Sequence, residues 1–160
     1  MAPVSIHRAG SGDLEVLVRL AAAFRDHLER TAPTDDAFRA GFATLLEDPG
    51  TEILIARDTD GAALGYVQAR YRYSAWNTAL DAELEDVFVT SAARRRGIGR
   101  DLVERAVRSA RDKGCRVIGL NTNERNAAAL ALYARLGFVA ERGFWDGARQ
   151  LWLEKSLDDG

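Results

Sequence analysis

One stretch of the sequence organises the rest of the chain: Leu84-Glu-Asp-Val-Phe-Val-Thr-Ser-Ala-Ala-Arg94-Arg-Arg-Gly97-Ile-Gly99-Arg-Asp-Leu-Val-Glu-Arg-Ala-Val107. It joins a short apolar strand to a turn rich in Arg and Gly, and then to a long amphipathic helix. Gly97 and Gly99 lack side chains and tolerate positive φ, so successive backbone N–H groups can converge on one anion. The helix adds unpaired N–H groups and the positive end of its dipole. Positive charge comes from Arg94, Arg95, Arg96 and Arg100, and the turn therefore predicts a multiply charged phosphate ligand.

The turn differs from the two commonest phosphate-binding loops. It has neither the Gly-x-x-x-x-Gly-Lys-Ser/Thr order nor a Gly-x-Gly-x-x-Gly opening. An arginine run on a surface turn can also be simply solvated, and this alternative stays open for the turn alone. The turn alone therefore does not identify the ligand, and a second motif further along the chain is needed.

Length and composition exclude several classes of protein. The 160 residues are 47% apolar and 29% charged, which is ordinary for a single globular domain. The formal net charge of −2 argues against a nucleic-acid partner, and one cysteine excludes an internal disulfide framework. No apolar run reaches membrane length and the first residues lack a signal-peptide pattern, so we expect a cytoplasmic protein with no membrane partner.

Periodicity, caps and turn residues predict the secondary structure. In chain order, the expected elements are a strand at 4–8, helices at 13–28 and 34–46, strands at 52–56, 64–73 and 80–89, a helix at 97–113, a strand at 115–121, a helix at 127–136 and a terminal hairpin of strands 138–141 and 150–155. The helix at 97–113 makes a right-handed crossover to a parallel strand. We therefore expect an α/β (mixed α+β) fold, with a mixed, mostly antiparallel sheet of about seven strands and helices on both faces.

Alternation within the strands predicts which side chains share a face. In the strand at 64–73, the residues on one face are Tyr66, Gln68, Arg70 and Arg72. In the strand at 80–89, Glu83 and Glu85 are expected on one face and Asp86 on the opposite face. This arrangement would allow only one of Glu85 and Asp86 to serve a given site.

Two motifs, one in each half of the chain, resemble those of the GNAT N-acetyltransferase superfamily. The pyrophosphate loop of that family, Gln/Arg-x-x-Gly-x-Gly/Ala, corresponds to Arg94-Arg-Arg-Gly97-Ile-Gly99. A second signature, Asn-x-x-Ala-x-x-x-Tyr followed by Gly-Phe, corresponds to Asn126-Ala-Ala-Ala129-Leu-Ala-Leu-Tyr133 and Gly137-Phe138. Both occur in the right order and on the right kinds of element, so the chain is identified as a member of this superfamily.

The resemblance implies a GNAT fold as one domain over residues 1–160, with acetyl-CoA as donor and an amine as the usual acceptor. Many members form dimers, which leaves a homodimer open for this chain. The residues that would contact acetyl-CoA are Val87, Phe88, Val89, Arg94, Arg95, Arg96, Gly97, Ile98, Gly99, Arg100, Asn126, Ala129 and Tyr133. The backbone N–H groups of the first three would also polarise the acetyl carbonyl.

A closer resemblance is to the spermidine/spermine (diamine) N-acetyltransferase branch. It rests on Tyr73-Ser-Ala-Trp76 and on Leu84-Glu-Asp-Val-Phe-Val89, which is similar to the Leu-Glu-Asp-aromatic-aromatic-Val strand of that branch. The sequence departs from the branch at Val87, where an aromatic residue is common, and at Arg95, where a glycine often stands. The branch shares this strand with acetyltransferases of other small amines.

The resemblance also assigns the two catalytic roles. A primary amine has a pKa of roughly 10, so its proton must be accepted before or during attack, and Glu85 matches the position of that base. A solvated carboxylate or a partner for Arg70 or Arg72 is the alternative for this residue. Tyr133 would donate a hydrogen bond or proton to the departing thiolate, and packing in the core is its alternative. Cys115 is expected to be buried and inert, which favours direct attack in a ternary complex.

The acceptor side is expected to be acidic. The predicted substrate-binding residues are Glu83, Glu85, Asp86 and Asn121. They favour a small cationic amine such as a diamine or polyamine, unless Arg70 or Arg72 neutralises them. The alternatives are an enzyme acting on a protein N-terminus, lysine or aminoglycoside, and a catalytically silent module that only binds acetyl-CoA. No metal site is predicted, because His7 and His27 have no Cys or His partner at ligand spacing.

Overall fold

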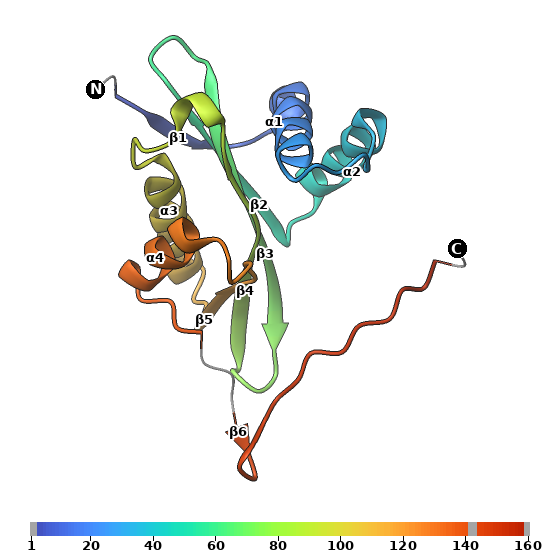
Figure 1. Cartoon of the computed structure of the whole chain (residues 1–160), viewed down its shortest axis with the longest axis vertical. Helices are drawn as coiled ribbons and strands as arrows, with labels where there is room; N and C mark the ends of the chain where they lie inside the picture. Colours follow the sequence, from blue (N-terminus) through green and yellow to red (C-terminus); the bar gives the residue numbers. More distant parts are fainter. Residues whose placement is uncertain (1–2, 141–143, 159–160) are drawn as a thin grey trace. The chain divides into compact units, whose positions relative to one another are not determined.

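The computed structural model describes residues 3–140 and 144–158, and the chain divides into two units, Met1–Asn123 and Glu124–Gly160. Each unit is described by itself. Figure 1 labels the helices and strands along the chain. None of the helices within the described residues is both long and apolar enough to cross a membrane.

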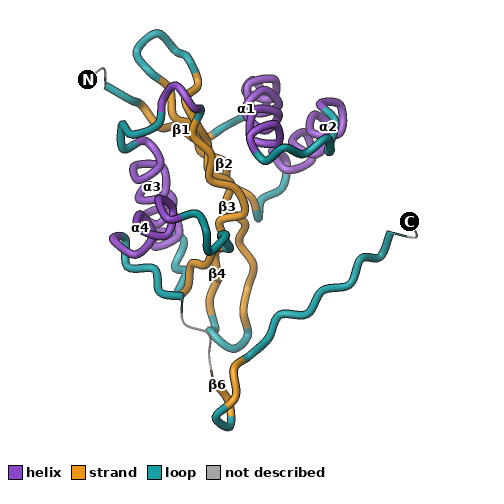
Figure 2. Tube along the Cα trace, viewed as in Figure 1, coloured by secondary structure: helices purple, strands orange, loops and turns teal. Residues whose placement is uncertain are grey.

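The first unit is built on a five-stranded sheet (Figure 2). Its strands, in spatial order, are β1 (Ser5–Arg8), β2 (Thr51–Arg57), β3 (Ala63–Ser74), β4 (Ala79–Val89) and β5 (Val117–Leu120). Neighbours pair antiparallel from β1 to β4, whereas β4 and β5 are parallel, as the crossover predicts.

Helices cover both faces of this sheet, which confirms that part of the predicted fold (Figure 1). After a 3₁₀ turn, η1 (Ser11–Asp13), the helices α1 (Leu14–His27) and α2 (Asp35–Glu47) lie on one face. A second 3₁₀ turn, η2 (Ser91–Ala93), precedes α3 (Ile98–Asp112) on the other face. The core under α1 includes Leu17, Ile55 and Tyr66, all fully buried, and Phe24 stacks on Phe88 with ring centroids 5.0 Å apart.

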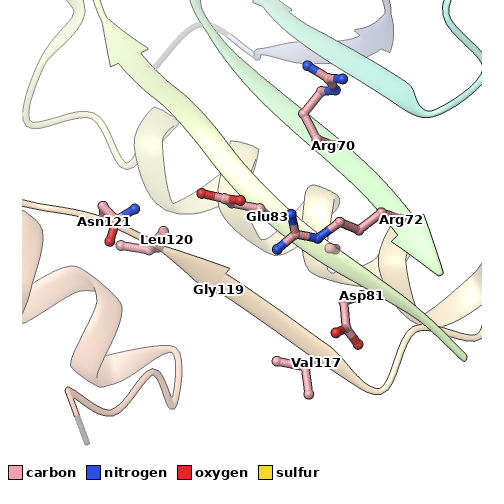
Figure 3. Close-up of a pocket in the computed structure, with 9 residues that line it drawn as sticks. Arg70, Arg72, Asp81, Glu83, Val117, Gly119, Leu120 and Asn121 are labelled. Carbon is pink, nitrogen blue, oxygen red and sulfur yellow. The ribbon is translucent and has the colours of Figure 1, made fainter. Parts of the chain in front are cut away.

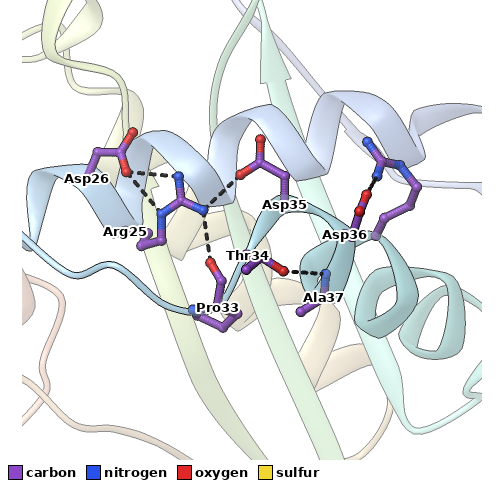
Figure 4. Close-up of polar contacts among 8 residues, drawn as sticks. Arg25, Asp26, Pro33, Thr34, Asp35, Asp36 and Ala37 are labelled. Carbon is purple, nitrogen blue, oxygen red and sulfur yellow. Dashed lines mark hydrogen bonds and ion pairs between the residues drawn. The ribbon is translucent and has the colours of Figure 1, made fainter.

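Polar contacts fix the junction between α1 and α2 (Figure 4). The Arg25 guanidinium donates to the Pro33 carbonyl and to the Asp35 carboxylate, each at 2.8 Å. Thr34 caps α2 by accepting a hydrogen bond from the backbone N–H of Ala37 at 3.2 Å. The loop between the two helices is therefore held by side chains from both.

The second unit contains α4 (Ala127–Arg135) and the short strands β6 (Phe144–Trp145) and β7 (Ala148–Arg149). Asn126 caps α4, since its Oδ1 accepts a hydrogen bond from the N–H of Ala129 at 3.2 Å. Gly137, at φ +86°, ends the helix in the left-handed conformation.

The predicted count of about seven strands in one sheet is wrong: the sheet has five, and among the described residues β6 and β7 pair with each other and not with that sheet. The strand expected at 138–141 is absent over its described residues, and its last residue lies outside them. Residues 150–155 also form no strand. Both strands had been predicted as a hairpin around Trp145-Asp146-Gly147, but a strand also needs a partner edge for its N–H and C=O groups, and no described residue pairs with these segments.

Candidate functional site

The loop between β4 and α3 has the conformation of an anion cradle. Gly97 is the N-cap of α3 and has φ +76°, and Arg95 is also left-handed, at φ +64°. The first hydrogen bond of the helix runs from the N–H of Asp101 to the carbonyl of Gly97. Among the described residues, none accepts a hydrogen bond from the six N–H groups of residues 95–100. Six consecutive donors are thus available at a positive helix end.

Side chains add charge to these donors. Arg94, Arg95 and Arg100 are exposed and Arg96 is half-buried. Arg94 donates through Nε to the Val89 carbonyl at 3.2 Å. Ile98 is buried, so only its backbone is available to a ligand. The loop therefore presents several guanidinium groups beside backbone donors.

The strand that leads into this loop has an open edge. Residues 81–84 of β4 pair with β5, and that parallel ladder ends at Leu84. The N–H of Thr90 donates to the carbonyl of Leu64 at 2.9 Å, so these two residues form a hydrogen-bonded pair at the end of the ladder with β3. Since such pairs alternate along antiparallel strands, Val87 and Val89 direct their N–H and C=O groups toward the open edge.

Phe88 differs from the two valines beside it. Its backbone is directed at β3 by the same alternation, and its ring is buried against Phe24. On β3, a Cβ added to Gly65 would collide with the carbonyl oxygen of Phe88. β3 therefore pairs tightly with β4 at this point, and among the described residues it is the opposite edge of β4 that has no partner strand.

A β-bulge in β4 changes which acidic side chains share a face. Leu84 lies opposite Ala69 and Asp86 lies opposite Gln68, so Glu85 is an extra residue without its own cross-strand partner. Strict alternation had predicted opposite faces for Glu85 and Asp86, and that prediction is wrong.

The pairing register shows where the carboxylates lie. Glu83 is opposite Arg70, and Asp86 is opposite Gln68. Arg70 and Gln68 are two residues apart on β3, so they share one face, and cross-strand partners share a face as well. The Glu85 carboxylate joins them by accepting a hydrogen bond from Gln68 Nε2 at 2.5 Å. Glu83, Glu85 and Asp86 therefore all project from one face of the sheet.

Arg70 only partly neutralises this acidic group. Its guanidinium lies 3.8 Å from Glu85 and 3.5 Å from Asp48, so it divides its charge between two carboxylates. The side chains of Arg70 and Glu85 are each more than a third exposed, which weakens the ion pair further. The cross-strand partner of Arg70, Glu83, has no hydrogen bond or ion pair with any described residue.

The Asp86 carboxylate is largely withdrawn from solvent and paired with a tyrosine. Burial raises the pKa of the Asp86 carboxyl above its ordinary value, against the opposing effect of a hydrogen bond from Tyr66 at 2.8 Å. Tyr66 is fully buried, and burial together with the Asp86 charge raises the pKa of its phenol. A raised carboxyl pKa moves Asp86 toward the range useful for a base near neutral pH.

Sequence reasoning missed Tyr66 and Gln68 as members of the site. Both had been assigned to the correct face of β3, but only as sheet residues. A buried tyrosine needs a partner for its hydroxyl, and the nearest acids in the predicted sheet are those of the next strand. That requirement is the signal that would have linked Tyr66 to Asp86.

The acidic face continues into a hollow of about 300 Å³ beside the last residues of β3, the first residues of β4 and the length of β5 (Figure 3). Charged residues that line it are Arg70, Arg72, Asp81 and Glu83. Asn121, directly after β5, lies at the same hollow. The structure thus brings together the predicted substrate-binding residues Glu83 and Asn121.

The remaining predicted residues lie in the second unit. Tyr133 packs edge-to-face against Phe138 with ring centroids 5.7 Å apart, and burial raises the pKa of its phenol. The N-cap role of Asn126 uses its side-chain oxygen and leaves the NH₂ group. Within the described residues no group of three or more His, Cys, Asp or Glu side chains is arranged to hold a metal ion.

Comparison with known proteins gives a consistent result. Residues 17–138 match the acetyltransferase (GNAT) family. Thialysine N-epsilon-acetyltransferase of Sus scrofa is 30% identical over 148 residues, which cover 86% of this chain and 85% of that protein. Streptothricin acetyltransferase of Streptomyces lavendulae is 37% identical over 93 residues, which cover 58% of this chain but only 47% of that protein.

A solved structure agrees at the level of the fold. The ribosomal-protein-alanine N-acetyltransferase from Brucella melitensis biovar Abortus 2308 superimposes with a TM-score of 0.74, at 22% identity, over 89% of this chain and 97% of that chain. The fold, the glycine and arginine loop and the matches in sequence lead to one conclusion. This chain belongs to the acetyltransferase (GNAT) family, whose enzymes transfer an acetyl group from acetyl-CoA.

Proposed function

We propose that this enzyme acetylates a primary amine of a small molecule that carries a second cationic group, as diamines and polyamines do. The observation that carries the proposal is the grouping of Glu83, Glu85 and Asp86 on one face, next to the open edge of β4. On this face the carboxylates of Asp81, Glu83, Glu85 and Asp86 outnumber the guanidinium groups of Arg70 and Arg72, and this excess of negative charge favours a cationic acceptor.

The fit of acetyl-CoA rests on two features of the first unit. The six free N–H groups of residues 95–100 and the exposed arginines suit the pyrophosphate, and Gly97 leaves the approach open. Val87 and Val89 suit the amide arm, which can add to the open edge as a partial strand. Bound there, acetyl-CoA would supply an acetyl thioester beside the acidic face.

The reaction needs a base and an acid from this chain. Glu85 is the proposed base, acting directly or through water, and Gln68 fixes its carboxylate by the hydrogen bond at 2.5 Å. Asp86 is an alternative on the same face, since burial raises the pKa of its carboxyl. Tyr133 is the proposed donor to the departing thiolate, and its raised pKa keeps it protonated near neutral pH.

Direct attack of the amine is preferred to an acetyl-enzyme route. Burial raises the pKa of the Cys115 thiol, so little thiolate is present near neutral pH to serve as a nucleophile. The relatives whose names specify a lysine analogue and streptothricin, together with the resemblance to the diamine branch, support a small basic acceptor. We infer a single transfer step within a ternary complex.

The test compares amines that differ in one charge. Putrescine, spermidine and butylamine are assayed with acetyl-CoA at matched ionic strength, using wild type, Glu85→Gln and the control Glu47→Gln on the exposed end of α2. We expect kcat/KM for the two polyamines to exceed that for butylamine about tenfold, and this preference to shrink in Glu85→Gln only. Equal kcat/KM values for all three amines would refute the proposed preference for an acceptor with a second cationic group. Absence of turnover despite acetyl-CoA binding would indicate a catalytically silent module.

A further inference from the structure

Arg70 is placed between two carboxylates that come from different elements. Its guanidinium lies 3.5 Å from Asp48, the C-cap residue of α2, and 3.8 Å from Glu85, the extra residue of the bulge in β4. Both distances exceed the roughly 2.7–2.9 Å of a charge-assisted hydrogen bond. The cross-strand neighbour of Arg70 is Glu83, but in Figure 3 the guanidinium is directed away from it. Arg70 is therefore a partly exposed cation with two loosely held partners among the described residues.

The Asp48 carboxylate is fixed in place by its own loop. It accepts hydrogen bonds from the backbone N–H of Gly50 at 2.9 Å and from the Thr51 hydroxyl at 2.7 Å. These two bonds hold the pKa of the Asp48 carboxyl below its ordinary value, so the group is charged throughout the neutral range. Asp48 can therefore take up the charge of Arg70 without moving.

The Glu85 carboxylate, in contrast, has one oxygen without a partner among the described residues. Its Oε2 accepts the hydrogen bond from Gln68 and is also the atom that lies 3.8 Å from Arg70. No hydrogen bond or ion pair joins its Oε1 to any residue that the structure describes. The side chain is 38% exposed, so an incoming ammonium group can reach this carboxylate. Glu85 is thus the partner from which Arg70 can be displaced.

We propose that Arg70 is a displaceable counterion that contributes to the selectivity of the acceptor site. In the free enzyme its guanidinium shields Glu85. When the ammonium group of an acceptor reaches Glu85, the guanidinium moves fully to Asp48. The inference rests on the proposed function, because it takes Glu85 as the carboxylate that receives the amine. It adds a competitor to that site, since only a ligand that brings a positive charge replaces the charge that Arg70 withdraws.

The weakness of the contact between Arg70 and Glu85 makes the exchange possible. Ion pairs between partly exposed side chains contribute little, and this pair is longer than a hydrogen bond. An ammonium group that approaches Glu85 to hydrogen-bond distance interacts with it more strongly than the guanidinium does. Without the Asp48 charge, Arg70 would lose its alternative partner and would stay at Glu85 in competition with the acceptor. The effect of Asp48 on acceptor binding should therefore exist only while Arg70 is present.

A double-mutant cycle measures this competition. KM and kcat for putrescine are determined in wild type, Arg70→Gln, Asp48→Asn and the double variant, where Asn keeps an acceptor for the Gly50 N–H. We expect Arg70→Gln to lower KM about threefold and Asp48→Asn to raise it about threefold, the scale of one exposed ion pair, with kcat changed by less than about twofold. In the double variant, KM should equal that of Arg70→Gln. Arg70→Lys keeps the charge and should stay near wild type, as should the control Arg19→Gln on the exposed face of α1.

Two results would overturn the inference. One is a KM for putrescine that rises or stays unchanged in Arg70→Gln, and the other is an effect of Asp48→Asn that is equally large with and without Arg70. If Asp48→Asn does not fold, the comparison of Arg70→Gln with Arg70→Lys decides, because only the loss of charge should lower KM.

The inference and the proposed function can fail separately. If no amine is turned over, the proposed function fails, and calorimetry of putrescine binding in the presence of CoA still tests Arg70 in the same variants. Tighter binding in Arg70→Gln than in wild type would support the inference in that case, and equal or weaker binding would refute it. Turnover of putrescine without coupling between Arg70 and Asp48 would refute the inference alone.

Discussion

Gly97 and Gly114 have nearly the same backbone conformation at opposite ends of α3. Their φ values are +76° and +78°, in the left-handed region that other residues rarely adopt. No residue atom lies within 4 Å of a Cβ added to Gly114, and the nearest to one added to Gly97 is Arg100 Nη2 at 3.6 Å. A side chain would therefore strain the backbone to a similar extent at either position, but only Gly97 lies at the proposed pyrophosphate site.

Alanine at either glycine should cost about 1 kcal/mol of stability through backbone strain. Only Gly97→Ala should also weaken the binding of acetyl-CoA, because the added Cβ would lie where the pyrophosphate is proposed to approach. Thermal melts with and without acetyl-CoA measure both effects. We expect the ligand-induced rise in Tm to shrink in Gly97→Ala and to stay near the wild-type value in Gly114→Ala. Equal rises in the two variants would exclude the loop as the binding site.

Tyr133 tests the proposed proton donor. Tyr133→Phe keeps the ring that packs on Phe138 but removes the hydroxyl, so the fold and acetyl-CoA binding should persist. Turnover should fall on the order of 10²-fold, as expected for the loss of one positioned acid. Tyr73→Phe, at a position 68% exposed, is the control. Wild-type turnover in Tyr133→Phe across the pH range would reduce Tyr133 to a packing residue.

Asp86 links the acidic face to the pH dependence of stability. Its carboxyl pKa is raised in the folded chain above the ordinary 3.8, so the folded chain holds this proton more tightly than the unfolded chain does. The associated stability is fully present below pH 3.8 and is lost as the pH rises through the folded-state pKa.

Asp86→Asn removes that loss while keeping an acceptor for Tyr66. The free energy of unfolding of the variant should therefore gain on that of wild type as the pH rises from about 3 to 7. Denaturant titrations across this range, with the exposed Asp60→Asn as control, provide the measurement. A difference between variant and wild type that does not vary with pH would show that the Asp86 carboxyl is not perturbed by burial.

At the scale of elements, β4 changes partners at its bulge. Up to Leu84 it pairs with both neighbours, and beyond the bulge at Glu85 it pairs with β3 only among the described residues. Bulges bend the strand that contains them. We infer that the extra residue is what turns β4 away from β5 and opens its edge.

Comparing a deletion of Glu85 with Glu85→Gln distinguishes the effect of the bulge from the effect of the carboxylate. The deletion restores one-to-one pairing between β3 and β4, so the fold should remain while the edge of β4 closes against β5. The rise in Tm with acetyl-CoA should then largely disappear in the deletion variant. Glu85→Gln keeps the bulge and should retain that rise while losing turnover. If both variants are stabilised alike by acetyl-CoA, the bulge does not create the ligand edge.

Features that depend on neighbouring residues in the sequence could be predicted, whereas a feature that depends on strand pairing could not. The loop before α3 was predicted because its information is local: two glycines, four arginines and the helix start all lie within residues 94–100. The faces of β3 followed from simple alternation. The bulge could not be predicted, since an extra residue leaves apolar content unchanged and becomes visible only when β4 is aligned with β3. The reversal of Asp86 to the face of Glu85 follows from that single residue.

At the scale of the whole molecule, charge is separated rather than abundant. The chain has a net charge of −2, yet arginines gather at residues 94–100 and carboxylates gather on the face of Glu83, Glu85 and Asp86. Composition predicted the absence of a general basic surface, and the motif predicted the local arginine cluster. The acidic face needed the cross-strand register, because its members come together across a bulge.

Ionic strength should therefore affect both substrates. The Debye length falls from about 30 Å at about 0.01 M salt to about 3 Å at about 1 M, which screens exposed charges. Steady-state assays should show the KM values for acetyl-CoA and for a diamine rising several-fold over this range, with a smaller change in kcat. Arg95→Gln should flatten the salt dependence for acetyl-CoA alone. KM values insensitive to salt would indicate that neither cluster attracts its ligand.

The close approach at Gly65 limits how the sequence of this fold can vary. A side chain at position 65 would collide with the Phe88 carbonyl oxygen and push β3 away from β4. β4 would then lack a closely paired neighbour on both of its edges instead of one. Residue 65 takes no part in the proposed reaction. A single substitution there would nevertheless shift the open edge of β4, where the amide arm of acetyl-CoA is proposed to bind. Loss of acetylation could thus arise in a descendant of this chain whose catalytic residues are all intact.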